Sequence, residues 1–226
     1  YLEEKPTGEI AAGAGFGTSG GTIFFNIKEN NYLGKGILVD SQLQLSAESI
    51  KGSIKTTNNN YKNTNKSVSF GLEADEVDRL SDFGYKSNKT GFSLGTKFEY
   101  LDDLRLGLGT STYYERIETD NTASARQKKQ EGDYWDTFLD IDFSYDKRNQ
   151  RFKATQGFTS YYSLNLPIIS TNYSVTSGYN YKVYTELFEN NISSFSFSLK
   201  GASSLTGKDI KLSERLSIPG NKLRGF

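Results

Sequence analysis

The most constraining feature of this sequence is the alternation of apolar and polar residues between positions 135 and 146. One set of alternate positions is apolar or aromatic, as at Trp135 and Leu139. The other set is mostly acidic, with Phe138 as the exception, and comprises Asp136, Asp140, Asp142, Ser144 and Asp146. A period of two is that of a β-strand, and a row of carboxylates cannot lie in a dry protein core. We therefore expect this face to border a water-filled lumen or open solvent.

The same alternation recurs along most of the chain, and aromatic residues, which favour strands, make up 14% of it. We predict roughly eleven strands of about ten residues, the length that a tilted strand needs to cross a bilayer. Residues 119–133 lack this periodicity and are predicted to form a long polar loop. The predicted strands cover residues 8–17, 22–30, 37–47, 50–57, 67–77, 89–100, 104–117, 135–145, 157–166, 173–187 and 194–205.

Short turns alternate with longer loops, as expected for a barrel with two different rims. Only 35% of the residues are hydrophobic, but a transmembrane barrel can be this polar because only alternate strand residues face lipid. We predict an all-β, transmembrane, antiparallel up-and-down β-barrel formed by a single domain, residues 1–226. Roughly eleven strands would leave an open edge in lipid, so we expect this barrel to be incomplete. A soluble sandwich is the alternative fold.

The residues that the chain lacks exclude several kinds of function. It contains no cysteine and no histidine, which excludes thiol chemistry and removes the commonest general base and metal ligand. The 27 basic residues balance 27 acidic ones, so no field of one sign attracts nucleic acid. We expect neither an enzyme nor a protein that binds a cofactor, a metal or nucleic acid. Because the chain starts at Tyr1 and contains no methionine, we expect a segment of a longer polypeptide.

Five short motifs occur in an order that resembles a known family. They are EEKPTGEI at 3–10, AGAGFGTSGG at 12–21, NYLGKG at 31–36, YDKRNQRFKATQGF at 145–158 and LRGF at 223–226. Together they resemble the BamA-type outer-membrane assembly factors, whose barrel follows a series of periplasmic POTRA modules. The resemblance implies about sixteen strands in the whole barrel. This chain would then begin just after the last POTRA module and end in external loop six.

The resemblance also implies a function, namely folding β-barrel proteins and inserting them into the bacterial outer membrane through a lateral gate. Implied partners are unfolded outer-membrane β-barrel proteins, outer-membrane lipids and periplasmic accessory lipoproteins, around a monomeric barrel in a hetero-complex. A two-partner secretion or autotransporter-assembly barrel that moves a single client class is the first alternative. A passive porin-like channel is the second.

The final motif suggests a site in the lumen. In the resembled family external loop six folds back into the barrel, where its arginine meets an acidic residue of the inner wall. This implies that Arg224 makes such an ion pair, that Gly225 permits a tight backbone and that Phe226 packs on the wall. The family's acidic partner belongs to a later strand, so Asp140 and Asp142 are candidate substitutes. A solvated basic residue in a fraying terminus is the alternative.

The first predicted strand is rich in small residues, which pack poorly and hold a strand weakly. We interpret it as one side of a lateral gate, whose edge could template an incoming strand by β-augmentation. The alternative is that small residues only relieve crowding at a curved seam. The residues in question are Gly8, Glu9, Ile10, Ala11, Ala12, Gly13, Ala14 and Gly15.

Two further motifs are expected to order periplasmic turns. In the first turn these residues are Asn31, Leu33, Gly34 and Gly36, and in the later turn they are Asp146 and Arg148. The carboxylates of Asp136, Asp140, Asp142 and Asp146 could also form a calcium site. This hypothesis is weak, because calcium ligands converge from a loop, whereas alternate strand residues are spread along a wall.

Overall fold

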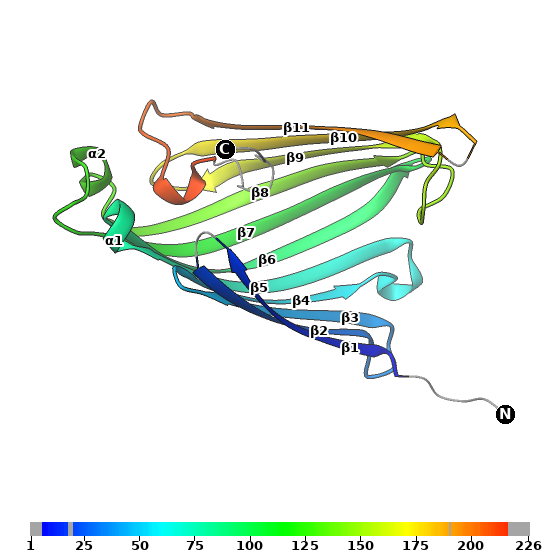
Figure 1. Cartoon of the computed structure of the whole chain (residues 1–226), viewed down its shortest axis with the longest axis horizontal. Coiled ribbons are helices and arrows are strands. Elements are labelled where there is room, and N and C mark those ends of the chain that lie inside the picture. Colours follow the sequence, from blue (N-terminus) through cyan, green and yellow to red (C-terminus); the bar gives the residue numbers. More distant parts are fainter. Residues whose placement is uncertain (1–5, 18–19, 190, 217–226) are drawn as a thin grey trace.

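The computed structural model describes residues 6–17, 20–189 and 191–216, and most of them form one antiparallel sheet (Figure 1). Its strands follow one another in chain order. They are β1 (Gly8–Gly17), β2 (Gly20–Tyr32), β3 (Ile37–Ser46), β4 (Ser49–Asn58), β5 (Lys66–Arg79), β6 (Tyr85–Leu101), β7 (Leu104–Thr119), β8 (Gly132–Asp146), β9 (Gly157–Ile169), β10 (Ser174–Phe188) and β11 (Asn191–Ser204). Short helical turns are η1 (Tyr61–Asn63), α1 (Leu80–Phe83), α2 (Ala125–Lys128) and η2 (Leu212–Glu214).

The predicted fold class is confirmed, and the predicted bounds of β1 agree with the structure. The sandwich alternative is wrong, because the described strands form a single sheet. The predicted loop 119–133 contains helix α2, which a capping box between Ser124 and Gln127 stabilises. Among the described residues, no helix is long and apolar enough to span a membrane.

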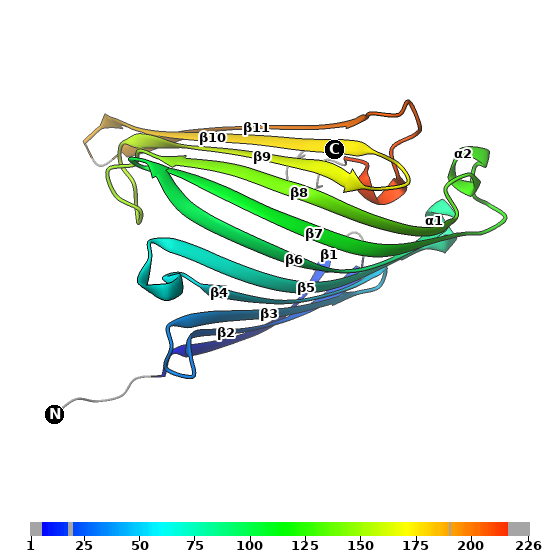
Figure 2. The same cartoon turned by 180° about the vertical axis from the view of Figure 1, so that it is seen from behind.

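The sheet curves into an open trough, as Figures 1 and 2 show from opposite sides. Within the described residues β1 and β11 each pair on one edge only. The start of β1 and the connections 33–36, 59–65, 102–103 and 147–156 lie at one end of the strands, which we call the turn rim. The connections 47–48, 80–84, 120–131 and 170–173 lie at the opposite end, the loop rim, where residues 205–216 also follow β11.

Strand registers separate the side chains onto two faces. One row across β5–β9 is small or polar and contains Ser69, Gly95, Gly109, Asp140 and Asn165. The next row lies on the opposite face and contains Phe70, Leu94, Thr110, Leu139 and Leu166. The polar face is the inner one, because residues 211–214 dock on it at Glu115 and Asp136.

Burial is inverted relative to a soluble protein. Among the described residues only Ile117, Ala123 and Ala154 are buried hydrophobics, whereas nine polar or charged residues are buried. Large apolar side chains are exposed on the outer face, among them Ile23, Phe25, Leu43, Ile54, Phe70, Leu72, Leu94 and Trp135. Such a distribution fits a sheet whose outer face contacts lipid. The orientation predicted from the alternation is therefore confirmed.

Candidate functional site

Strand β1 is an edge strand made mostly of small residues. It pairs with β2 along its whole length, from Gly8 opposite Glu29 to Gly17 opposite Gly20. Its other edge carries no strand within the described residues. On the outer face Ile10 is 80% exposed and Phe16 is 94% exposed, so neighbouring side chains cover β1 very little. An unpaired edge with weak side-chain packing can accept a further strand.

Two glycines of β1 distinguish the two interpretations of its small residues, namely a weakly held gate strand and relief of steric crowding. A Cβ atom at Gly13 would lie 2.3 Å from Cε1 of Phe24, so any larger residue at position 13 would force the phenyl ring of Phe24 to move. A Cβ atom at Gly15 would have no neighbour within 4 Å. Relief of crowding therefore explains Gly13, whereas nothing in the described structure crowds position 15. The small residue there is consistent with a weakly held strand.

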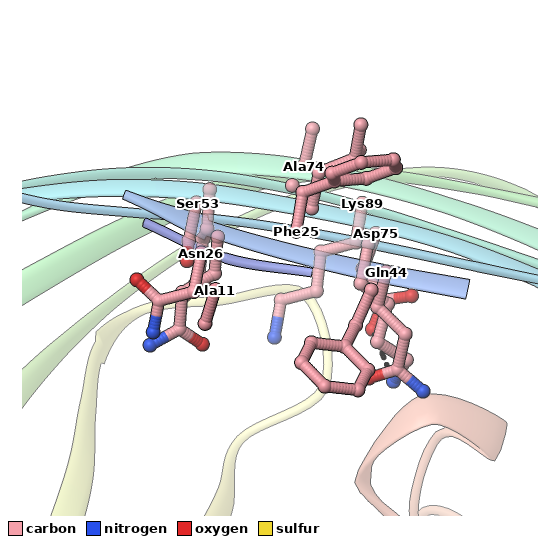
Figure 3. Close-up of a pocket in the computed structure, with 14 residues that line it drawn as sticks. Ala11, Phe25, Asn26, Gln44, Ser53, Ala74, Asp75 and Lys89 are labelled. Atoms are coloured by element: carbon pink, nitrogen blue, oxygen red, sulfur yellow. Dashed lines mark hydrogen bonds and ion pairs between the residues drawn. The ribbon is translucent and has the colours of Figure 1, made fainter. Parts of the chain in front are cut away.

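At this edge, the inner wall of β1–β6 forms an open pocket that is lined by both polar and apolar residues (Figure 3). In Figure 3 the side chains of Asn26, Gln44 and Lys89 extend to the inner side of the sheet and Phe25 to the other. Lys51 donates a hydrogen bond to Asp75 at 3.0 Å within this lining. The wall next to β1 thus carries polar and charged side chains, as the sequence alternation predicts.

The first turn, residues 33–36, is ordered by the amide of Asn31. Its side-chain oxygen accepts a hydrogen bond from the backbone N–H of Gly36 at 2.7 Å, and its backbone oxygen accepts one from Gly34 at 2.9 Å. Gly34 and Gly36 adopt φ values of +69° and +65°, a region that favours glycine. Leu33 also has a positive φ, of +55°. The predicted turn residues therefore act together in one turn.

In the later turn, Arg148 donates two side-chain hydrogen bonds to Asp146, at 2.9 and 2.7 Å. Lys147 forms an ion pair of 2.7 Å with Asp103 of the neighbouring turn, which raises the pKa of Lys147. Gly157 has a φ of +96°, and a Cβ atom there would lie 2.1 Å from the backbone oxygen of Lys147. These contacts order the turn rim.

The segment after β11, residues 205–216, which we call the docked segment, folds onto the inner wall at the loop rim. The ammonium group of Lys211 contacts Oε2 of Glu115 on β7 at 3.2 Å and Oδ2 of Asp136 on β8. It also contacts Oε1 of Glu214 at 3.3 Å. Lys211, Glu115 and Asp136 are each only 1% exposed. Burial alone would lower the pKa of Lys211, but the surrounding carboxylates outweigh burial and raise it.

Serine hydroxyl groups complete the shell of these carboxylates. Oε1 of Glu115 accepts a hydrogen bond from Ser87 at 2.8 Å, and Oε2 accepts one from Ser213 at 2.9 Å. Oδ1 of Asp136 accepts one from Ser170 at 2.6 Å, and Glu214 accepts one from Ser174. Each buried carboxylate therefore has a donor besides Lys211.

A second group of contacts binds the docked segment to the loop rim. Arg126 of α2 pairs with Asp209, and this neighbouring charge lowers the pKa of Asp209. Gln130 accepts a hydrogen bond from the backbone N–H of Leu212 at 2.9 Å and donates one to the backbone oxygen of Ile210 at 3.3 Å. Unlike the Lys211 cluster, the Arg126–Asp209 pair is exposed. The docked segment is therefore attached at two places, the buried Lys211 cluster and the solvent-exposed Arg126–Asp209 pair.

The motif Arg224, Gly225 and Phe226 lies outside the described residues, so its ion pair stays a prediction. The two candidate partners have other contacts, since Asp140 accepts a hydrogen bond from Asn165 at 2.6 Å and Asp142 pairs with Lys97 at 3.0 Å. No group of three metal-ligating side chains lies together in the described ranges.

Sequence reasoning missed Lys211 and Glu115. Alternation places Glu115 on the inner face, but no local pattern links it to a residue 96 positions later.

Comparisons with known proteins agree with this geometry. Residues 31–226 match the family described as the Omp85 superfamily domain. The fold is similar to the crystal structure of BamA from Haemophilus ducreyi lacking POTRA domains 1–3, with a TM-score of 0.77 and 19% sequence identity. That match covers 95% of this chain but only 44% of the other, so this chain spans less than half of its length. With the family matched over most of the sequence, we conclude that this chain belongs to the Omp85 superfamily and is a protein of the bacterial outer membrane.

Proposed function

We propose that this chain forms the first part of the barrel of an outer-membrane assembly factor, which folds β-barrel proteins and inserts them into the outer membrane. No covalent chemistry is involved in this function. Its partners are unfolded outer-membrane barrel proteins, outer-membrane lipids and periplasmic accessory lipoproteins, and the barrel acts as a monomer within that complex. The turn rim faces the periplasm and the loop rim faces the exterior.

The observation that carries this proposal is the edge of β1. β1 is the first strand of the sheet, so the edge that it does not share with β2 would border the last strand of the whole barrel. If that contact opens, the backbone N–H and C=O groups of β1 can pair with a client strand by β-augmentation. The open space at Gly15 and the high exposure of Ile10 and Phe16 indicate that few side-chain contacts hold β1 in place. Weak side-chain packing lowers the cost of parting β1 from the strand on its other edge, which is what a lateral gate requires.

The outer face near β1 also supports a role in insertion. On β2 the outward apolar run extends only from Ile23 to Ile27 before Glu29, a length of about 13 Å at 3.3 Å per residue. On β8 the outward run extends from Trp135 to Tyr145, a length of about 33 Å. A short apolar band thins the adjoining bilayer. A locally thin bilayer lowers the barrier to inserting a new barrel beside β1.

Depletion of the full-length protein in its own bacterium tests this function. The proposal predicts that the levels of several unrelated outer-membrane barrel proteins fall together. Loss of a single secreted client with normal barrel levels would instead indicate a two-partner secretion barrel. Normal levels of all barrel proteins, together with a steady conductance of the purified protein in planar bilayers, would indicate a passive channel.

Arg224→Glu in the full-length protein tests the predicted role of external loop six. Reversing this charge would make Arg224 repel its acidic partner in the lumen. We expect reduced levels of outer-membrane barrel proteins at normal expression of the variant. Lys222→Glu, which reverses a charge in the same loop two positions before Arg224, is the matched control. Unchanged barrel levels in the Arg224 variant would contradict the predicted role.

A further inference from the structure

Lys211 is the residue through which the docked segment contacts two buried carboxylates of the inner wall. Within the described residues it is the only cation that forms an ion pair with Glu115 or Asp136. These two residues belong to neighbouring strands, β7 and β8, so one side chain ties the segment to both. The ring of Tyr134 lies 5.1 Å from the ammonium group and covers it on another side.

The charges of this cluster make the contact selective. Glu115, Asp136 and Glu214 bring three negative charges around one positive charge, in a site that is almost closed to solvent. If the docked segment left the wall, Glu115 and Asp136 would lose their cation, and their mutual repulsion would no longer be compensated. Ser87 and Ser170 fix the wall carboxylates in place from the strand side and the rim side. The wall therefore presents a preformed site for a single cation.

The segment beyond Lys211 continues along the lumen. Ser213, Glu214, Arg215 and Leu216 line a pocket together with inner-wall residues that include Tyr113. The last described residues, 213–216, therefore lie at the inner wall and not at the outer surface. Arg224 follows Leu216 by eight positions.

We infer that Lys211 is a positioning residue, whose ion pairs with Glu115 and Asp136 hold the base of external loop six against the inner wall of the barrel. This inference rests on the proposed function, in which that loop acts from within the lumen. The cluster is a second attachment, separate from the one expected of Arg224, and it comes from strands at the middle of this chain. The Arg126–Asp209 pair attaches the same segment from solvent and contributes little, because exposed ion pairs are weak.

Cysteine labelling in the full-length protein tests this inference. The chain contains no cysteine, so a single cysteine at Leu212, whose side chain is partly buried in the docked segment, is a specific reporter in a full-length background without other cysteines. A membrane-impermeant maleimide added to intact cells labels this cysteine slowly when the segment is docked. We expect Lys211→Met to accelerate labelling at least roughly tenfold, because it leaves three carboxylates without their cation. Arg126→Ala is the matched control and should stay within about twofold of the parent protein.

A charge exchange keeps the test decisive if Lys211→Met fails to fold, as judged by heat-modifiable migration on gels. The double variant Glu115→Lys, Lys211→Glu retains one positive and three negative charges, and we expect it to fold and to label as slowly as the parent. Faster labelling of the folded double variant, failure of the double variant to fold, or unchanged labelling of a folded Lys211→Met would each overturn the inference.

A second readout separates this inference from the proposed function. The level of outer-membrane barrel proteins is measured in the same cells. Faster labelling with normal barrel levels would support the positioning role of Lys211 and contradict the proposed function of the loop. Unchanged labelling with reduced barrel levels would contradict the positioning role and leave the proposed function standing.

Discussion

The edge at β1–β2 and the wall at β7–β8 belong to one sheet but are built in opposite ways. At the edge, β1 pairs on one side only and its residues are mostly small. At the wall, both strands are paired on both sides, and a buried ion cluster binds the docked segment to them. Under the proposed function, β1 is the strand that opens, and β7 and β8 belong to the frame that stays closed.

The outer faces of the two regions differ in the same sense. From β7 to β10, aromatic side chains form a ladder on the lipid-facing side, with centroid distances of 6.5 Å for Tyr114–Trp135 and for Phe143–Tyr162 and 5.6 Å for Phe158–Tyr181. Aromatic pairs of this kind stabilise packing and anchor a barrel at the membrane interface. No aromatic pair occurs between the described residues of β1 and β2. The lipid-facing contacts are therefore strong at the wall and weak at the edge.

The largest effect is expected at the buried cluster of the wall. Lys211→Met should lower the free energy of unfolding of the full-length protein by about 3–5 kcal/mol, since it leaves buried carboxylates without a partner. Urea titration in detergent micelles measures this loss. The variant Lys211→Met with Glu115→Gln and Asp136→Asn removes charge from both sides and should recover most of the stability. Equal stability of the parent and the single variant would show that the cluster does not strengthen the wall.

The next effect compares the two outer faces through the same substitution. Leu139→Arg places a charge in the middle of the long apolar run of β8 and should cost about 2–4 kcal/mol. Ile23→Arg lies at the end of the short run of β2 and should cost about 0–1 kcal/mol. Reversible unfolding from lipid vesicles measures both values. A larger cost at Ile23 than at Leu139 would contradict the claim that the bilayer is thin beside β1.

A smaller effect distinguishes two glycines within β1. Gly13→Ala forces the ring of Phe24 to move and should cost about 1–3 kcal/mol. Gly15→Ala meets no atom and should stabilise the strand by about 0.5–1 kcal/mol, because it reduces the entropy of the unfolded chain. Phe24→Ala should abolish the penalty at position 13. If both alanine variants lose the same stability, the steric explanation of Gly13 is wrong.

The smallest effect is expected at the exposed pair of the loop rim. Arg126→Ala should not measurably change the urea midpoint, because both partners are open to solvent. Arg126 depresses the pKa of Asp209, so the contribution of this pair is present above the unfolded pKa and is lost as pH falls through the folded pKa. Any effect of this substitution on the midpoint should therefore be small and the same at every pH between about 5 and 8. A clearly lower urea midpoint of the Arg126 variant in that pH range would show that the exposed Arg126–Asp209 pair, and not Lys211, holds the docked segment.

Much of the fold could be predicted because the two-residue alternation can be recognised within each strand without knowledge of its partners. The sequence alone assigns Leu139 to the outer face and Asp140 to the inner face. The turn at Asn31 is equally readable, since two glycines with positive φ need no distant partner. Phe138 looked like an error in the pattern, but it lies on the inner face, where its ring centroid is 6.3 Å from that of Tyr113.

The candidate site could be predicted only in part, because its contacts cross long stretches of chain. Lys211 meets Asp136, 75 positions earlier, and no local spacing marks that pair. The glycine at 13 was attributed to weak packing, but the ring of Phe24 on the next strand decides it. Periodicity assigns a residue to a face, whereas only the register of the strands and the path of the docked segment assign its neighbour.

Site-specific photo-crosslinking tests the central claim, that client strands pair with β1. A photoreactive residue is placed at Ala12 on β1 or at Leu139 on β8, both on the outer face, in the full-length protein of growing cells. The account predicts adducts with newly made outer-membrane barrel proteins from position 12 and none from position 139. Equal adducts from the two positions, or none from position 12 while barrel proteins are being assembled, would contradict it.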